Sequence, residues 1–199
     1  MAGAAAAANR IARVSAMKSL KGHLLVASPD LLDPNFLKTV VLLVQHSEQG
    51  ALGLVVNRPT KTTVKQALAQ VSNAPCHRQE VLGLGGPCQG SLMAVHTLEC
   101  LKEIEVLPHV YFSAESDNLE RLVVTKGDPV RFFVGFAGWA PGQLEAELKT
   151  GSWRTTVATA EHIFQGGADL WEQITKQITS SVLLSTLKIK HVPDDPSMN

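Results

Sequence analysis

The chain has 199 residues, 45% of them hydrophobic, and 18 basic side chains balance 18 acidic ones to a formal net charge of zero. This neutral total disfavours a nucleic-acid-binding protein, because a basic excess that neutralises phosphates supplies much of the affinity of that class. No apolar run approaches the roughly 20 residues that cross a bilayer, so we expect no membrane partner.

The chain begins with an alanine-rich segment that contains arginine and lysine but no acid. Such low-complexity sequence does not build a core, and we predict that residues 1–17 are a disordered extension or a tag. The basic, acid-free composition also fits an organelle transit peptide. Met17 precedes the first patterned segment and is a candidate for the natural start of the protein.

The next segments predict a strand, a turn and a hairpin. Residues 22–28 indicate a buried strand. Asp33 and Pro34 predict a short helical turn, since a carboxylate caps free N–H groups and proline suits the first helical position. Residues 39–46 and 51–57 indicate two strands joined by a short polar turn, an antiparallel hairpin. Both strands are apolar on both faces, so we place the hairpin in the middle of a sheet.

Proline and glycine mark the following elements. Pro59 ends the return strand, because proline cannot donate to a ladder. Val64, Leu68 and Val71 then recur at helical spacing. Residues 81–96 indicate a strand, a glycine turn and a second strand.

The second half of the chain alternates strands and helices. Strands are predicted at 109–114 and 129–139, and helices at 117–126, 141–149 and 168–178. Because strands outnumber helices and several are linked by hairpins, the pattern indicates an α+β fold with a mostly antiparallel sheet and helices packed on it.

We expect one domain over residues 18–190, followed by a flexible tail at 191–199. The three cysteines are odd in number, and no pair has the two-residue spacing of zinc or redox motifs. This usage indicates a reduced, cytoplasmic protein.

The segment GLGGPCQG at 83–90 invites comparison with phosphate-binding loops. A strand follows it where a dinucleotide site needs a helix, and Pro87 lacks an N–H group that would hold phosphate. The Gly-Lys-Ser/Thr of a P-loop is also missing. We interpret the segment as a structural turn and predict no cofactor.

Two histidines, His46 and His96, each close an apolar strand. A histidine at a strand end is usually half-buried and hydrogen-bonded. Nothing in the spacing requires two or three histidines or carboxylates to converge, so we predict no metal site. An enzyme would use His46 or His96 as a base and Glu145 as an acid in a hydrolytic or transfer step.

Polar residues stand at the ends of several predicted elements. In NRP at 57–59 the asparagine can stop a ladder, while the arginine can pair with a carboxylate or clamp an anion. The carboxylates after GFAGW either favour the dipole of the helix that follows or line a polar site. We hypothesise a binding rim at one end of the sheet, formed by Asp33, His46, Asn57, Arg58, Trp139, Gln143 and Glu145.

Three segments resemble the signatures of one family. GHLLVASPDLLDPNFLKTVVLLVQHSEQGALGLVVNRP at 22–59, LGGP at 84–87 and GFAGWAPGQLEAELKTGSW at 135–153 are similar, in this order, to those of the YqgE/AlgH family. The resemblance covers roughly residues 18–190. The family commonly has tyrosine where this chain has Phe136. The resemblance implies a branched, mostly antiparallel α+β sheet and a transcriptional-regulator label, without an established activity.

We therefore expect a non-enzymatic, cytoplasmic binding or regulatory protein, because the glycine, proline and aromatic residues of the signatures fix shape. Its partner would be a protein or a small ligand bound at the rim. DNA is disfavoured by the zero net charge and by the lack of helix-turn-helix spacing. The alternative is a hydrolase- or transferase-type enzyme at the same rim.

Overall fold

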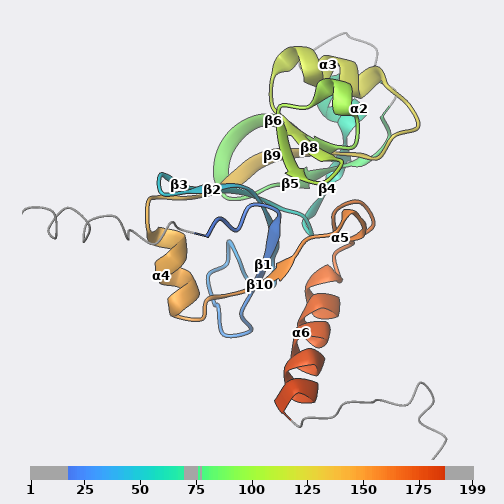
Figure 1. The fold of residues 1–199 in the computed structure, drawn as a ribbon. Coiled ribbons are helices and arrows are strands. Elements are labelled where there is room, and N and C mark those ends of the chain that lie inside the picture. Colours follow the sequence, from blue (N-terminus) through green and yellow to red (C-terminus); the bar gives the residue numbers. More distant parts are fainter. Residues whose placement is uncertain (1–17, 70–75, 77, 187–199) are drawn as a thin grey trace, which may run out of the picture.

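The computed structural model describes residues 18–69, 76 and 78–186. Within them, a sheet of ten strands carries five α-helices, which is an α+β fold (Figure 1). The strands are β1 (His23–Ala27), β2 (Val40–Ser47), β3 (Gly50–Val55), β4 (Pro59–Thr63), β5 (Val81–Leu84), β6 (Cys88–His96), β7 (Ile104–Leu107), β8 (Val110–Ser113), β9 (Val130–Trp139) and β10 (Trp153–Val157). Their order along the main path is β10-β1-β2-β3-β9-β6-β8-β7.

The β2–β3 hairpin lies in the middle of the sheet, as its apolar faces predicted. β1 pairs with the outer edge of β2, and β9 pairs with that of β3, all antiparallel. The hairpin register runs from Val41 opposite Val55 to Ser47 opposite Gly50. Gly50 has φ +117°, and a Cβ there would collide with the backbone oxygen of Trp139, so only glycine fits this turn.

The sheet branches at β9. The first half of β9 pairs with β6 on one side and, in parallel, with β5 on the other, while its second half pairs with β3. Gly135, at φ +71°, stands between the two halves. β4 pairs only with β5 among the described strands and completes the branch. The mostly antiparallel, branched sheet implied by the family resemblance is confirmed.

The helices are α2 (Val64–Leu68), α3 (Ser116–Val124), α4 (Gln143–Lys149), α5 (Ala160–Phe164) and α6 (Leu170–Thr186), with a 3-10 turn at Glu99–Leu101. Figure 1 shows α2 and α3 together over the branch, with α4 and α6 in the other half of the molecule. No helix among the described residues is long and apolar enough to cross a bilayer.

Each helix group covers its own hydrophobic cluster. Val64 of α2 and Leu122 of α3 pack on one cluster beneath the branch. Leu144 of α4 packs on a second with Trp139 and Trp153. The third and largest cluster lies between the central strands and the α5–α6 region, where Ile163 is fully buried.

Of two local predictions in this region, one was confirmed and one was wrong. The short turn predicted at Asp33 and Pro34 is present: Asp33 Oδ1 accepts the backbone N–H of Asn35 at 2.8 Å, and the backbone oxygen of Asp33 accepts the N–H of Leu37 at 2.8 Å. No α-helix continues from this turn. Pro59 does not end a strand: β3 stops at Val55, and Pro59 begins β4 on an edge, where its missing N–H breaks no ladder bond.

Four elements had no counterpart in the sequence reasoning: β4, β7, β10 and α5. The two strands predicted at 81–96 exist, but they pair with β9 and not with each other. The helix predicted at 168–178 continues to Thr186. Val71, the extension at 1–17 and the tail at 191–199 lie outside the described residues.

Candidate functional site

His46 joins three segments at the turn end of the β2–β3 hairpin. Its Nε2 lies 2.8 Å from Oε1 of Glu145 on α4, and its Nδ1 accepts the backbone N–H of Leu20 at 2.9 Å. Ser19 Oγ donates to the backbone oxygen of His46 at 2.8 Å. These bonds fasten the segment before β1, the central hairpin and α4 at one point.

The hydrogen-bond pattern assigns the tautomer of His46. Because Nδ1 accepts an N–H group, the ring proton resides on Nε2 and is donated to the Glu145 carboxylate. A hydrogen bond from its own backbone N–H lowers the pKa of Glu145, burial opposes that effect, and the bond from His46 lowers the pKa further. His46, with its side chain 2% exposed, has no free lone pair to offer a substrate.

Glu147 is the hub of the second site feature, an aromatic cluster. Its Oε2 accepts the indole N–H groups of Trp139 at 2.9 Å and Trp153 at 2.8 Å. The two indole rings meet edge-on with centroids 6.0 Å apart, and Phe36 stacks on Trp139 at 6.2 Å. One carboxylate thus holds two largely buried tryptophans, from β9 and from the start of β10.

Gln143 completes the same network. Its Oε1 accepts the backbone N–H of Ala140 at 3.0 Å, and its Nε2 donates to Oε1 of Glu147 at 2.9 Å. Gln143 therefore fixes the turn between β9 and α4. The sequence reasoning missed the role of Glu147, although the signal was present: its i, i+4 spacing from Gln143 puts both side chains on one helix face.

Arg58 points away from that network, into the turn before β2. Its Nη1 donates to the backbone oxygen of Asn35 at 2.6 Å, and Nη2 donates to those of Pro34 at 3.2 Å and Leu37 at 3.3 Å. Burial lowers the pKa of Arg58, and the charge of Asp33 opposes this shift. An anion clamp would need these same donors, but here the guanidinium uses them to close the turn.

Asn57 is equally occupied. Its Oδ1 accepts the backbone N–H of Val40 at 2.9 Å, and its Nδ2 donates to the backbone oxygen of Lys38 at 2.9 Å. The residue replaces ladder bonds where β2 begins and β3 has ended.

The seven expected rim residues fall into two groups at opposite ends of the hairpin. His46 lies at its turn end, in contact with Glu145, while Asn57 bonds Val40 at its open end. The six-residue step from Val40 to His46 spans about 20 Å of strand. Trp139, Gln143 and Glu145 belong with His46, and Asp33 and Arg58 belong with Asn57.

His96 has a different environment. It is fully buried, its Nε2 lies 2.9 Å from Oγ of Ser113, and that hydroxyl donates to the backbone oxygen of Leu101 at 2.7 Å. Burial lowers the pKa of His96, opposed by the charge of Glu103 and a backbone bond at Leu98. No bond joins His96 to Glu145 among the described contacts, so the two do not form an acid–base pair.

The glycine segment packs backbone against backbone. Gly85 donates its N–H to the oxygen of Val134 and accepts the N–H of Val55. A Cβ on Gly86 would collide with the backbone of Phe136. This close crossing fits the interpretation of GLGGPCQG as a structural turn.

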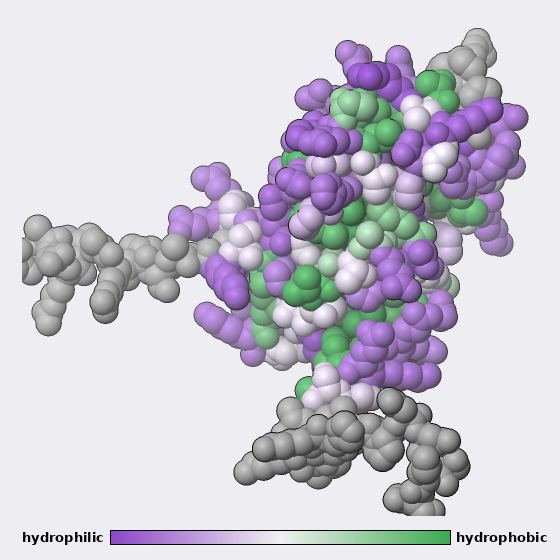
Figure 2. Space-filling view, turned by 45° about the vertical axis from the view of Figure 1, so that its right-hand side comes forward, coloured by the Kyte–Doolittle hydropathy of each residue, from purple (hydrophilic) through white to green (hydrophobic). Residues whose placement is uncertain are grey.

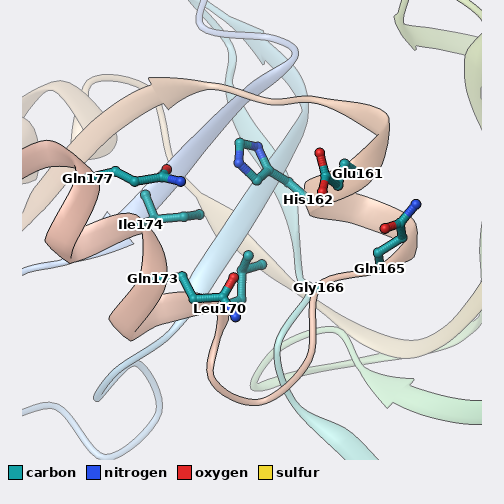
Figure 3. Close-up of a pocket in the computed structure, with 8 residues that line it drawn as sticks. All are labelled: Glu161, His162, Gln165, Gly166, Leu170, Gln173, Ile174 and Gln177. Atoms are coloured by element: carbon teal, nitrogen blue, oxygen red, sulfur yellow. The ribbon is translucent and has the colours of Figure 1, made fainter. Parts of the chain in front are cut away.

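A hollow of about 230 Å³ lies between α5 and α6 (Figure 3). Leu170 and Ile174 form its apolar side, and the glutamines at 165, 173 and 177 surround it with His162 and Glu161. The Nδ1 of His162 accepts the backbone N–H of Thr159 in a capping box, so this ring also has a structural task.

A second hollow, of about 430 Å³, lies where the branch meets the end of α5. Arg131 lines it, and Pro59, Val81 and Phe164 form an apolar part of its wall. We call it the Arg131 hollow. The sequence signal for it is a lone arginine inside the apolar strand VRFFV. Across the described part of the chain, no three metal-ligating side chains gather into a cluster.

Comparison with known proteins places these features in a family context. A family model described as AlgH-like matches residues 24–182. A protein named UPF0301 from Chlorobaculum tepidum is 36% identical over 186 residues, which cover 89% of this chain and 95% of that protein. A UPF0301 protein from Myxococcus xanthus is 39% identical over 162 residues, 78% of this chain and 89% of that protein.

Two solved structures have a similar fold. The solution structure of the AlgH protein from Pseudomonas aeruginosa has a TM-score of 0.68 and 32% identity, and covers 90% of this chain and 98% of that chain. The crystal structure of a protein from Corynebacterium diphtheriae has a TM-score of 0.62 at 23% identity, with 81% and 88% covered, and supports the fold alone.

Proposed function

This chain belongs to the AlgH-like family, and we propose that it is a non-enzymatic binding protein of the cytoplasm. In this proposal the signature residues hold the branched sheet in shape, and a ligand occupies the Arg131 hollow. Three free cysteines, at 76, 88 and 100, suit a reducing compartment.

The main support for the proposal is that the polar side chains of the signature segments already form hydrogen bonds within the protein. A general base must present a lone pair within hydrogen-bond reach of its substrate. Both nitrogens of His46 are engaged, by Leu20 and by Glu145. Glu147 accepts three hydrogen bonds from the protein itself. Groups bound in this way support shape better than they support a chemical step.

The surface supports binding. On the face that Figure 2 shows, hydrophobic side chains reach the surface across the middle of the molecule, between hydrophilic ones. Val81, at the Arg131 hollow, is 48% exposed. An apolar wall beside a few polar groups is the usual composition of a ligand site.

A link to transcription would, in this proposal, pass through a bound protein or small ligand. DNA contact is disfavoured because the chain has no net charge. Arg58, Lys61 and Lys65 form a small basic cluster. Arg58 donates its hydrogen bonds to backbone oxygens, so few cations of this cluster remain to contact phosphates.

A metabolite experiment tests the proposal against the enzyme alternative. The purified protein is incubated with a cell metabolite extract, and every species is followed over time by mass spectrometry. Glu145→Gln removes the only carboxylate bonded to His46 among the described contacts, and Glu120→Gln on the exposed face of α3 is the matched control. We expect no consumption that depends on Glu145.

The same samples are analysed by native mass spectrometry, where we expect a ligand that co-purifies in a fixed ratio and is released on unfolding. Turnover of a metabolite that is lost in Glu145→Gln and kept in Glu120→Gln would refute the proposal and establish the enzyme.

A further inference from the structure

Arg131 is the one arginine that lines the Arg131 hollow. Its Nη1 donates to the backbone oxygen of Ile163 at 2.7 Å, and its Cζ lies 5.2 Å from the ring centroid of Phe133. No carboxylate of the described residues stands within ion-pair distance of it. Burial lowers the pKa of this guanidinium, with no opposing charge.

Arg131 is partly buried, and a charge removed from water without a counter-ion is unusual in a folded protein, because desolvation is unfavourable unless a pair or hydrogen bonds offset it. A guanidinium carries five N–H donors in a fork that matches a carboxylate. The protein uses one of them in a described hydrogen bond, and the ring of Phe133 covers one face. Among the described contacts, the other donors of the Arg131 fork are left for a ligand in the hollow.

The walls of the hollow select the body of the ligand. Pro59, Val81, Pro129 and Phe164 give it an apolar lining. Val81 is 48% exposed although it is a large hydrophobic residue of a strand. An apolar group placed on this wall would remove that surface from water, which stabilises binding by roughly 25 cal/mol per Å².

The charges around the hollow select the head of the ligand. Glu80 and Asp128 also line it. Glu80 is bonded to Arg78 at 3.1 Å, whereas Asp128 has no cationic partner among the described ion pairs. A dianion such as a phosphate monoester would place its second charge near Asp128. A monoanion needs only the guanidinium.

We propose that the Arg131 hollow binds a small organic monocarboxylate, with its carboxylate on Arg131 and its apolar body on Pro59, Val81 and Phe164. This inference rests on the proposed function and names the ligand class of that site. Neither His46 nor His96 takes part.

The test is a titration of the full-length, ¹⁵N-labelled protein with 3-phenylpropionate, followed by NMR. The neutral 3-phenylpropionamide has the same apolar body without the charge, and phenyl phosphate supplies a dianion. We expect saturable shifts of the Arg131 Nε–Hε signal and of the amides of Gly127 and Gly166 with the carboxylate. The amide and the phosphate should bind about tenfold or more weakly.

Protein variants provide the second arm. Arg131→Gln removes the charge, and Val81→Glu places a carboxylate on an exposed part of the wall, where it should not disturb folding. Both should weaken 3-phenylpropionate by about tenfold or more. Arg154→Gln, on the exposed face of β10, is the matched control and should bind as the wild type does.

The proposal of a monocarboxylate ligand would be overturned by any of three results: equal binding of the amide and the carboxylate, tighter binding of phenyl phosphate, or unchanged affinity in Val81→Glu. An absence of shifts at the hollow with all three probes would also overturn it. These failures differ from failure of the proposed function, which would appear as Glu145-dependent turnover.

Discussion

Removing the Glu147 carboxylate should destabilise the fold more than any other single change to a partly exposed side chain in α4. Its Oε2 is the acceptor for the indole N–H groups of both Trp139 and Trp153. A hydrogen bond to a charged group contributes about 1.5–3 kcal/mol, and both tryptophans are at most 5% exposed. We expect Glu147→Ala to lower the free energy of unfolding by about 3 kcal/mol.

Glu147→Gln should lower the free energy of unfolding by less, about 1–2 kcal/mol. The hydrogen bonds of Gln143 explain why some loss remains. If the new amide oxygen accepts both indoles, its NH₂ group faces the NH₂ group of Gln143. Rotation of Gln143 would relieve this, but it would also remove the acceptor of the Ala140 N–H.

The assay is urea unfolding followed by tryptophan fluorescence, with calorimetry as a second probe. For a domain of this size, a loss of 3 kcal/mol corresponds to a fall in Tm of about 6–12 °C. Glu120→Ala, on the exposed face of α3, is the control and should stay within about 0.5 kcal/mol of the wild type. A Glu147→Ala variant that also stays within that range would refute the reasoning.

Three further changes probe the rest of the scaffold. Glu145→Gln should destabilise the protein more at pH 7 than at pH 3. The pKa of Glu145 is lowered on folding, so its contribution is present above the ordinary carboxyl value of 4.5 and is lost as pH falls through the folded-state pKa. A difference from wild type that is the same at both pH values in urea unfolding would contradict this. Gly50→Ala should lower the free energy of unfolding by about 3 kcal/mol or prevent folding. Gly127 is also at positive φ but has nothing within 4 Å of a Cβ, so Gly127→Ala should lower it by only about 1 kcal/mol. Equal melting temperatures of the two variants would count against the close crossing at Trp139. Asn57→Ala should cost about 1–3 kcal/mol in the same assay, because a buried N–H of Val40 and the oxygen of Lys38 lose their partner; a neutral result would show that Asn57 does not hold the open end of the hairpin.

The central hairpin could be predicted from the sequence because its information is local. Apolar residues on both faces of 39–46 and 51–57 imply cover on both sides, and β2 and β3 indeed have neighbours on their outer edges. The same holds for α3, whose Leu119, Leu122 and Val123 share one buried face.

The elements that the sequence did not reveal depend on distant partners. β10 is mostly polar and exposed outside Trp153, and it is a strand because β1 offers an open edge. β4 begins with a proline and acquires its ladder from β5, more than 17 residues later. Neither partner can be read from the local pattern.

The rim hypothesis illustrates the same limit for side chains. Polar residues at element ends were predicted to converge on one rim, but sequence does not say at which end of the sheet each of them lies in space. His46 and Asn57 belong to the two ends of one hairpin. Arg131 was overlooked because an arginine in an apolar strand usually indicates a solvent-facing position, and only the fold reveals that Phe133 and Ile163 enclose it.

The most direct measurement of the central claim is a map of backbone amide shifts on binding of the co-purified ligand to the full-length protein. The account predicts that the shifts concentrate around Val81, Gly127, Arg131 and Gly166, while His46, Gln143 and Glu145 stay unperturbed. Shifts centred on His46 and Glu145 would contradict it, since they would show that the signature residues contact the ligand themselves.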